Sequence, residues 1–285
     1  MKRQRSEKWN DWRTKVARKC DDLARNFGGR AGAVALRDIA LHRRITRIEF
    51  RPLLVEGGLG RRGGGFVMFV KCAAEQAAEF TARFHESGGR DLPARTRFTI
   101  AHEIAHTLFF DLTPSKPIPL FEASHPAELE SLESACNLGA NELLLPSHRF
   151  EEVLQTSDLL QPEKLLEVAK RFGISVDVLM VRLSRTRMWG SNHGAAAIVS
   201  VFGGELKLDA FAADRYSESL FPADSEQLRA LEILRDDRLS LFGGAQSSVE
   251  NEIACRNGAK QAYTAACAPI NPKGSRHILS FRLKR

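Results

Sequence analysis

The sequence predicts an α+β protein that is mainly helical over its first two thirds and ends in a smaller α+β part. Three observations support this prediction: long apolar segments with helical periodicity, two short β-rich runs near the N-terminus, and a change to short alternating segments after Trp189. With 285 residues, of which 43% are hydrophobic and 27% charged, the chain is long enough for two domains with well-buried cores.

The N-terminal elements are expected to be two helices, at 6–27 and 34–43, followed by two strands, at 45–53 and 65–72. Strands are expected because both runs are rich in β-branched and aromatic residues. The segment between them, EGGLGRRGGG, is expected to form a flexible hairpin connection because glycine dominates it. It lacks the Lys-Ser/Thr pair of a phosphate-binding loop, which argues against a nucleotide site there.

Further helices are expected at 73–86, from Pro93 to Phe110, and from Pro126 to Pro146. Proline suits the first turn of a helix, and a later proline ends one because it cannot continue the hydrogen-bond pattern. The segment 162–185 is expected to form a helix, a turn at Gly173 and a second helix, which resembles a helix-turn-helix.

The C-terminal part is expected to contain a hairpin, a helix at 224–236, a second hairpin that turns at Asn-Gly, and a final strand, HILSFRLK. Together, these elements predict a three-part chain. The parts are an N-terminal domain at 1–155, a helix pair at 156–190 and a small α+β domain at 193–285.

The net charge of +7 is concentrated at the N-terminus, where the first nineteen residues hold eight Lys/Arg and two acids. A basic helix of this kind can contact nucleic acid or an acidic partner. A solvated helix face is the favoured interpretation, because the segment lacks the interleaved stacking pattern of single-strand binders.

Membrane and secretory classes are disfavoured. No apolar run reaches the roughly 18 residues that a membrane span needs, and the N-terminus is too charged to hold the apolar centre of a signal peptide. The five cysteines are scattered and form no CxxC pair. This distribution predicts reduced thiols in a cytoplasmic protein.

The helix expected after Pro93 carries His102, Glu103 and His106 in apolar surroundings, RTRFTIAHEIAHTLFFD. Residues four apart share a helix face, so both imidazoles can reach one metal ion at about 2.0–2.1 Å. Glu103 is expected beside the metal, where a general base for a water molecule belongs. The pattern H-E-x-x-H is the zinc metalloprotease signature. The alternative is two core histidines bonded to backbone, with Glu103 at the surface.

A catalytic zinc site takes three protein ligands and leaves one position open, so a third ligand must come from elsewhere. In the next helix, Glu133 and Asn137 are four apart and share a face. Glu133 can be the third ligand, and Asn137 can hydrogen-bond a ligand and hold its orientation. Glu130 and Glu128 are the alternatives for the third ligand.

The segments RTRFTIAHEIAH and ESACNLGANELLLP resemble the ImmA/IrrE family of metallopeptidases. The family pattern is R-x-x-F-S/T-x-A-H-E-x-x-H, followed by E-x-x-A-N-x-F/L-A-x-x-L-L-x-P. The resemblance extends from about residue 15 to 188 and selects Glu133 over Glu130 as the glutamate ligand. Gly139 stands where a large apolar residue is common, and this departure is expected to loosen the helix packing.

This resemblance implies a zincin-like peptidase domain at 1–155, with His102, His106 and Glu133 as metal ligands and Glu103 as the catalytic base. It implies a bacterial or phage protease that cleaves a helix-turn-helix transcriptional repressor and so switches on stress-response or mobile-element genes. The C-terminal domain would be sensor-like, as in the radiation-response regulators. Zinc is the expected metal, although Mn²⁺ or Fe²⁺ can also occupy two imidazoles and a carboxylate.

Two further features are candidates for roles in peptide cleavage. His125, in the loop before the Glu133 helix, is a candidate electrophile, although a surface histidine is the favoured interpretation. The strand 65–72 precedes the active-site helix, and we expect it to pair with an extended substrate backbone.

Other functions stay open. The helix pair offers Arg182, Arg185 and Arg187 for direct DNA binding, but its second helix is mostly apolar, so packing against the peptidase part is favoured. A catalytically weak or inactive regulator that binds a repressor without cutting it is the other alternative. Cys255 and Cys267 are expected in facing strands, as buried free thiols rather than a redox pair.

Overall fold

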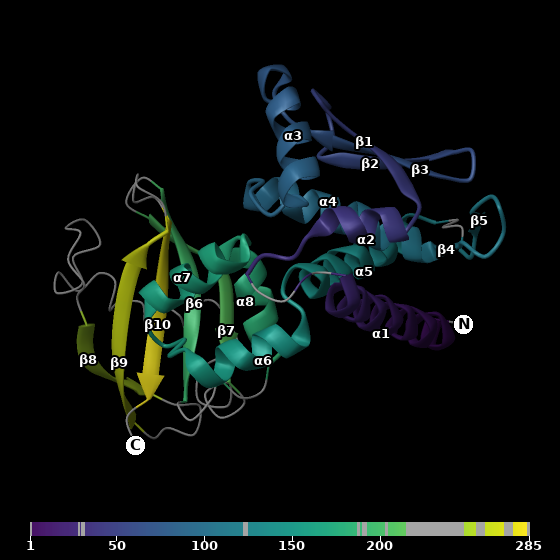
Figure 1. The fold of residues 1–285 in the computed structure, drawn as a ribbon. Helices are drawn as coiled ribbons and strands as arrows, with labels where there is room; N and C mark the ends of the chain where they lie inside the picture. Colours follow the sequence, from purple (N-terminus) through teal and green to yellow (C-terminus); the bar gives the residue numbers. More distant parts are fainter. Residues whose placement is uncertain are drawn as a thin grey trace. The chain divides into compact units, whose positions relative to one another are not determined.

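The computed structural model describes residues 2–27, 29, 32–121, 125–186, 189, 193–202, 205–214, 248–254, 260–270 and 276–283. The helix expected at 224–236, the expected Asn-Gly turn at 257–258, Arg187 and Cys255 lie outside these residues. The chain divides into two compact units, residues 1–150 with 171–175, and residues 151–170 with 176–285. Helices and small sheets make up the chain, which confirms the predicted α+β class (Figure 1). The three-part division stays a prediction.

The first unit contains five helices, two short 3₁₀ turns and five strands among its described residues. In chain order they are α1 (Lys2–Phe27), α2 (Leu36–His42), β1 (Ile45–Arg51), β2 (Gly57–Arg62), β3 (Gly65–Lys71), η1 (Ala74–Gln76), α3 (Ala77–Ser87), α4 (Ala94–His106), η2 (Thr107–Phe109), β4 (Phe110–Asp111), β5 (Ile118–Pro119) and α5 (Pro126–Leu144).

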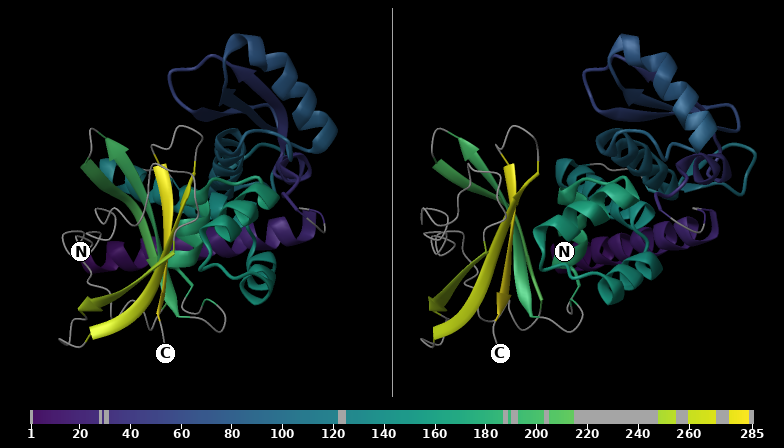
Figure 2. Two further views of the ribbon diagram at one scale, coloured as in Figure 1. Left: turned by 90° about the vertical axis from the view of Figure 1, so that its left-hand side faces the viewer. Right: turned by 60° about the vertical axis from the view of Figure 1, so that its left-hand side comes forward.

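A three-stranded sheet with the order β1-β3-β2 forms one layer of this unit. β1 pairs with β3 in parallel, and β2 pairs with β3 antiparallel. The helix α3 lies along this sheet in both views of Figure 2, and Phe50 of β1 packs edge-on against Phe80 of α3 at 5.9 Å. The buried apolar side chains of β3 face the helices, so the sheet and α4 share one core.

The strand β2 occupies the segment for which the sequence predicts a flexible connection, so that prediction is wrong. β2 pairs with β3 over its whole length, from Gly57 opposite Val70 to Arg62 opposite Gly65. Strand propensity does not predict a strand in this segment, because the propensity reflects how well side chains pack on a pleated surface and glycine has no side chain to pack.

The helices α1, α4 and α5 meet closely at Gly139 of α5. A Cβ atom at this position would lie 2.8 Å from Sγ of Cys20, 2.9 Å from Cγ1 of Val16 and 3.0 Å from Cβ of Ala105. The predicted loosening of the packing is therefore wrong. Since real Cβ atoms do not approach neighbours this closely, the glycine is what allows the three helices to pack together.

The second unit contains α8 and a five-stranded antiparallel sheet with the order β7-β6-β10-β9-β8. The elements from residue 147 onward are α6 (Ser147–Thr156), α7 (Pro162–Phe172), α8 (Val176–Ser184), β6 (Gly194–Phe202), β7 (Glu205–Ala213), β8 (Ser248–Ala254), β9 (Lys260–Pro269) and β10 (Arg276–Leu283). The two hairpins and the final strand expected from the sequence are present. In the described part of the chain, no helix is both long enough and apolar enough to cross a bilayer.

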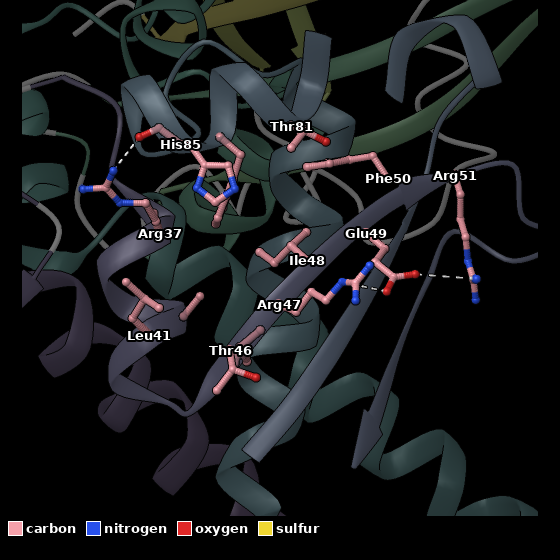
Figure 3. Close-up of a pocket in the computed structure, with 13 residues that line it drawn as sticks. Arg37, Leu41, Thr46, Arg47, Ile48, Glu49, Phe50, Arg51, Thr81 and His85 are labelled. Carbon is pink, nitrogen blue, oxygen red and sulfur yellow. Dashed lines mark hydrogen bonds and ion pairs between the residues drawn. The ribbon is translucent and has the colours of Figure 1, made fainter. Parts of the chain in front are cut away.

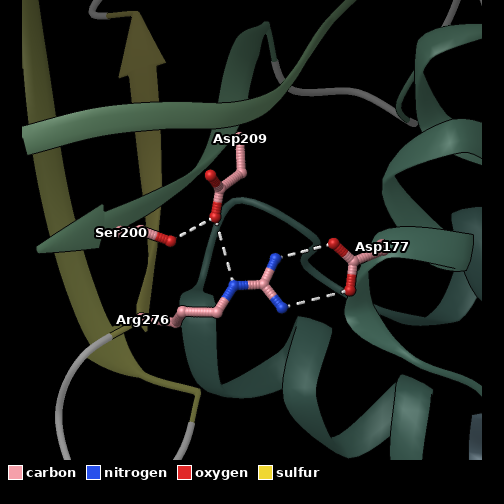
Figure 4. Close-up of polar contacts among 4 residues, drawn as sticks. All are labelled: Asp177, Ser200, Asp209 and Arg276. Carbon is pink, nitrogen blue, oxygen red and sulfur yellow. Dashed lines mark hydrogen bonds and ion pairs between the residues drawn. The ribbon is translucent and has the colours of Figure 1, made fainter.

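The helix α8 packs on the C-terminal sheet, mainly on β7, whereas the sequence favours packing against the peptidase part. Its apolar residues, among them Leu179 and Met180, are buried. Arg276 of β10 links α8 to the sheet by two ion pairs, one with Asp177 of α8 at 2.7 Å and one with Asp209 of β7 at 3.2 Å (Figure 4). A DNA-recognition helix needs a free polar face, and the burial of α8 leaves little of one.

Candidate metal centre

The helix α4 carries the two histidines, and Arg97 fixes its N-terminal half. The Arg97 side chain is fully buried and donates to the carbonyls of Gly173 at 2.9 Å, Gly89 at 2.6 Å and Val34 at 3.1 Å. Burial lowers the pKa of Arg97 to about 10, so the guanidinium stays charged at neutral pH. Because three separate loops converge on one guanidinium, the direction of α4 is set before any metal binds.

His102 and His106 leave the same face of α4, as predicted from their spacing. Their Nε2 atoms lie 2.9 Å apart, and both side chains are mostly buried. The surrounding helix positions, Ile100, Ala101, Ile104 and Ala105, are fully buried, which holds the histidine face toward the cleft described below. The alternative of two separate core histidines, each bonded to backbone, does not fit two rings in direct contact.

Glu133 and Asn137 reach the same point from α5. One carboxylate oxygen of Glu133 lies 3.0 Å from Nε2 of His102, and the other lies 3.5 Å from Nε2 of His106. The bond with His106, together with the nearby imidazoles, holds the pKa of Glu133 below its usual range although burial opposes this. Oδ1 of Asn137 lies 2.9 Å from Nδ1 of His102.

The Asn137 contact determines which nitrogen of His102 carries the proton. A carbonyl oxygen accepts a hydrogen bond, so Nδ1–H donates to Asn137 and Nε2 keeps its lone pair. Burial and the neighbouring His106 lower the pKa of His102, which favours this neutral form. The lone pair of His102 Nε2 therefore points to the place where the Glu133 carboxylate and His106 Nε2 also converge.

The donor set fits a tetrahedral metal ion. Two ligands at about 2.05 Å from a tetrahedral zinc are about 3.3 Å apart, and the three donor separations here, 2.9, 3.0 and 3.5 Å, bracket that value. One carboxylate and two imidazoles suit Zn²⁺, with Mn²⁺ and Fe²⁺ as chemically compatible ions. The described residues thus form a candidate metal site with an open fourth position.

Glu103 lies beside the two imidazoles and does not point away from them. Its donor oxygen and the ring nitrogens of His102 and His106 all lie within 4.8 Å of one another. Its side chain is only 6% exposed, so the alternative of a surface glutamate is wrong. Burial raises the pKa of Glu103 to about 7, which is the range a general base needs at neutral pH.

These residues open into a cleft of about 840 Å³ with a largely apolar wall. The wall is formed by Phe98, Phe109, Phe110, Phe121, Leu129 and Leu132. Val55–Leu59, which are the start of β2 and the residues before it, also line the cleft. The exposed apolar side chains of Val55 and Leu129 belong to this cleft, which indicates a site for an apolar partner segment.

The other sequence candidates lie elsewhere. His125 is exposed at the N-terminus of α5, and Glu128 and Glu130 follow within the next two turns. None of these three is among the described residues that line the cleft. The segment 55–59 is the part of the site that the sequence missed. Its only sequence signal was the run of glycines, which is ambiguous between a loop and a close backbone approach.

The edge strands of the sheet are β1 and β2. Along β1, Arg47 and Arg51 pair with Glu49 at 2.9 and 3.6 Å, beside a second cavity of about 570 Å³ (Figure 3). Charged side chains of this kind protect an edge against strand addition. β3 is paired on both sides, so the prediction that the strand at 65–72 binds substrate is wrong. The edge that borders the cleft belongs to β2.

Comparison with known proteins finds one matching family model and a solved structure of similar fold. Residues 89–184 match the model of the IrrE N-terminal-like domain family. Among solved structures, a Mycobacterium tuberculosis transcriptional regulator has a similar fold, with 13% sequence identity and a TM-score of 0.51 over 94% of this chain and 87% of that chain. The curated proteins gave no match. The matched residues contain both motifs by which the sequence resembles the ImmA/IrrE family.

Proposed function

We propose that this protein is a zinc-dependent endopeptidase that cleaves a helix-turn-helix transcriptional repressor. The observation that carries the proposal is the convergence of His102, His106 and Glu133 beside the buried Glu103 in one apolar cleft. The repressor as substrate rests on the resemblance to the ImmA/IrrE family. The solved structure of similar fold, which is named a transcriptional regulator, is compatible with such a role.

The side chains of the site would divide the work of the reaction between them. His102, His106 and Glu133 would hold the cation, and Asn137 keeps the lone pair of His102 directed at it. When bound, the cation supplies Lewis acidity that polarises the scissile carbonyl and makes an attacking water more acidic. Glu103 accepts the proton of that water as it attacks the carbonyl carbon. The same carboxyl then gives the proton to the leaving amine, which balances the step.

The cleft supports an extended peptide as the substrate. The segment 55–59 presents a strand edge on one side, where a peptide backbone can add by hydrogen bonds. The apolar side chains that line the same cleft favour large apolar side chains next to the scissile bond. A protein repressor would therefore have to offer a locally extended or unfolded apolar segment at the cleavage site.

Incubation with candidate repressors tests the proposal. Wild-type protein and the Glu103→Gln variant are loaded with zinc and incubated with helix-turn-helix repressors encoded nearby, and the products are identified by mass. The wild type is expected to give two fragments whose masses sum to that of the repressor plus one water. Glu103→Gln is expected to give them at least about 100-fold more slowly.

A matched control is Glu130→Gln, which makes the same chemical change on an exposed residue outside the cleft and should cleave as the wild type does. A wild-type protein that binds a repressor tightly but leaves it intact would support the alternative of an inactive regulator. Retardation of duplex DNA that falls steeply with salt and persists with chelator would instead indicate direct DNA binding.

A further inference from the structure

The strand β2 lies against α4 at Gly57, next to Thr99 and Glu103. A Cβ atom at Gly57 would lie 2.6 Å from Cγ2 of Thr99, 2.9 Å from Oε1 of Glu103 and 3.2 Å from the carbonyl oxygen of Phe69. Real Cβ atoms do not come so close to other atoms. The backbone of β2 can therefore rest on the Glu103 carboxylate only because residue 57 has no side chain.

The other glycines of β2 do not share this requirement. A Cβ at Gly58 would meet nothing within 4 Å, and one at Gly60 would make ordinary contact with the Phe69 ring at 3.4 Å. The glycine at position 57 is thus distinguished by its contact with α4 and not by the general composition of the strand. Gly60 also lies outside the residues that line the cleft, which makes it a suitable control position.

Glu103 depends on such contacts for its position. His102 is held through its hydrogen bond to Asn137, and Glu133 through its bonds to the two imidazoles. Among the hydrogen bonds found for the described residues, none is made by the Glu103 side chain. Its carboxylate is confined by the packing around it, and β2 at Gly57 is part of that packing, since a Cβ there would lie 2.9 Å from Oε1.

We propose that Gly57 is a positioning residue for the general base. Because Gly57 has no side chain, the β2 backbone can pack against Glu103. This packing holds the carboxylate in the position from which it can take a proton from water in the cleft. The same segment of β2 lines the cleft in which a substrate would bind. Gly57 therefore influences the position of the strand edge as well as the position of the Glu103 carboxylate. This inference rests on the proposed peptidase function. It adds Gly57 to the metal ligands and the general base, which define that function without it.

The Gly57→Ala variant tests the inference directly. The added methyl must displace Glu103, Thr99 or the strand, and a misplacement of about 1 Å at a catalytic group costs about 100-fold in rate. We expect kcat for repressor cleavage to fall by about 10- to 100-fold while KM stays within a few-fold. Gly60→Ala, which adds the same methyl to the same strand, is expected to keep both values near those of the wild type.

Zinc affinity, measured by competition with a coloured chelator, gives a readout independent of cleavage. It should be unchanged in Gly57→Ala, because the atoms that the methyl would meet belong to no metal ligand. Adding Thr99→Ser removes the methyl that lies closest to the new side chain and keeps the hydroxyl that donates to the Arg95 carbonyl at 3.2 Å. The double variant is expected to regain part of the lost kcat.

Comparison in the Glu103→Gln background separates positioning from general damage. If Gly57 acts through Glu103, then adding Gly57→Ala to Glu103→Gln should lower the residual activity no further. An equal fold-loss in both backgrounds, unchanged kcat in Gly57→Ala, or loss of zinc affinity in that variant would each overturn the inference. A wild type that cleaves nothing would instead overturn the proposed function and this inference with it.

Discussion

Nδ1 of His102 on α4 lies 2.9 Å from Oδ1 of Asn137 on α5, so a side chain from one helix orients a candidate metal ligand on the other. The contact leaves Nε2 of His102 without a proton, so that its lone pair can bind a metal ion. Glu133 and His106 converge on the same nitrogen. The paired helices α4 and α5 are therefore the framework of the site, and the features that fix their packing should also affect metal binding.

Removal of the Asn137 amide should weaken the metal site without removing a ligand. In Asn137→Ala, His102 loses the acceptor that selects its tautomer, and we expect zinc affinity to fall by about 10- to 100-fold. The measurement is chelator competition at fixed pH. Asn137→Asp is the control, since it keeps an acceptor oxygen and should retain most of the affinity. Equal affinity in the wild type and Asn137→Ala would show that the contact has no orienting role.

Arg97 should be important for stability rather than for chemistry. Arg97→Ala leaves three buried carbonyls without their donor, and we expect a loss of about 3 kcal/mol or more in the free energy of unfolding. Urea unfolding measures this loss. Arg95→Ala removes an arginine that is 80% exposed, and it should change stability by about 0.5 kcal/mol or less. Similar losses for both variants would argue that the buried guanidinium is not a structural clamp.

A side chain at Gly139 should separate α1 from α5. Gly139→Leu introduces atoms where Cys20, Val16 and Ala105 leave no room, and overpacking of this kind costs about 1–3 kcal/mol or more. Gly58→Ala adds a side chain in open space and is expected to be nearly neutral. The measurement is again urea unfolding. A fully stable Gly139→Leu would mean that α1 can move away from α5 at little cost.

The buried cysteines should be unreactive in the folded protein. Cys20 and Cys136 are fully buried, and burial is the main cause that raises the pKa of each thiol well above its usual value. Burial also raises the pKa of Cys267 to about 12. Because only the thiolate reacts, labelling of all three by iodoacetamide should be slow at pH 8 and fast only in denaturant. Peptide mass analysis after a timed pulse measures the labelling, and rapid native labelling of Cys20 or Cys136 would contradict their burial.

The convergence of the candidate metal ligands could be predicted from sequence because coordination chemistry imposes its own spacing. Two imidazoles four residues apart on a helix can bind one metal ion together, which gives Glu103 between them a role as the base beside that ion. The resemblance then singled out Glu133 as the third ligand. These residues meet in the structure as that interpretation requires. His125 did not come to the cleft, because a loop position before a helix carries no such constraint.

The parts that were missed involve glycine or depend on the choice of a packing partner. Gly57 and Gly139 are close-approach positions, and a sequence cannot distinguish them from glycines of a flexible loop or a loosened helix. The apolar face of α8 predicted burial correctly, but the pattern does not say which surface will cover it, and the C-terminal sheet does so.

The central claim is that His102, His106 and Glu133 together hold one divalent cation. Native mass spectrometry of the protein, purified without chelator and then titrated with zinc, tests it most directly. The account predicts one zinc ion per chain in the wild type and in Glu103→Gln, and a loss of at least about 100-fold in affinity in His102→Ala and Glu133→Ala. A wild type that binds no zinc, or a Glu133→Ala variant that binds it as tightly as the wild type, would contradict the account.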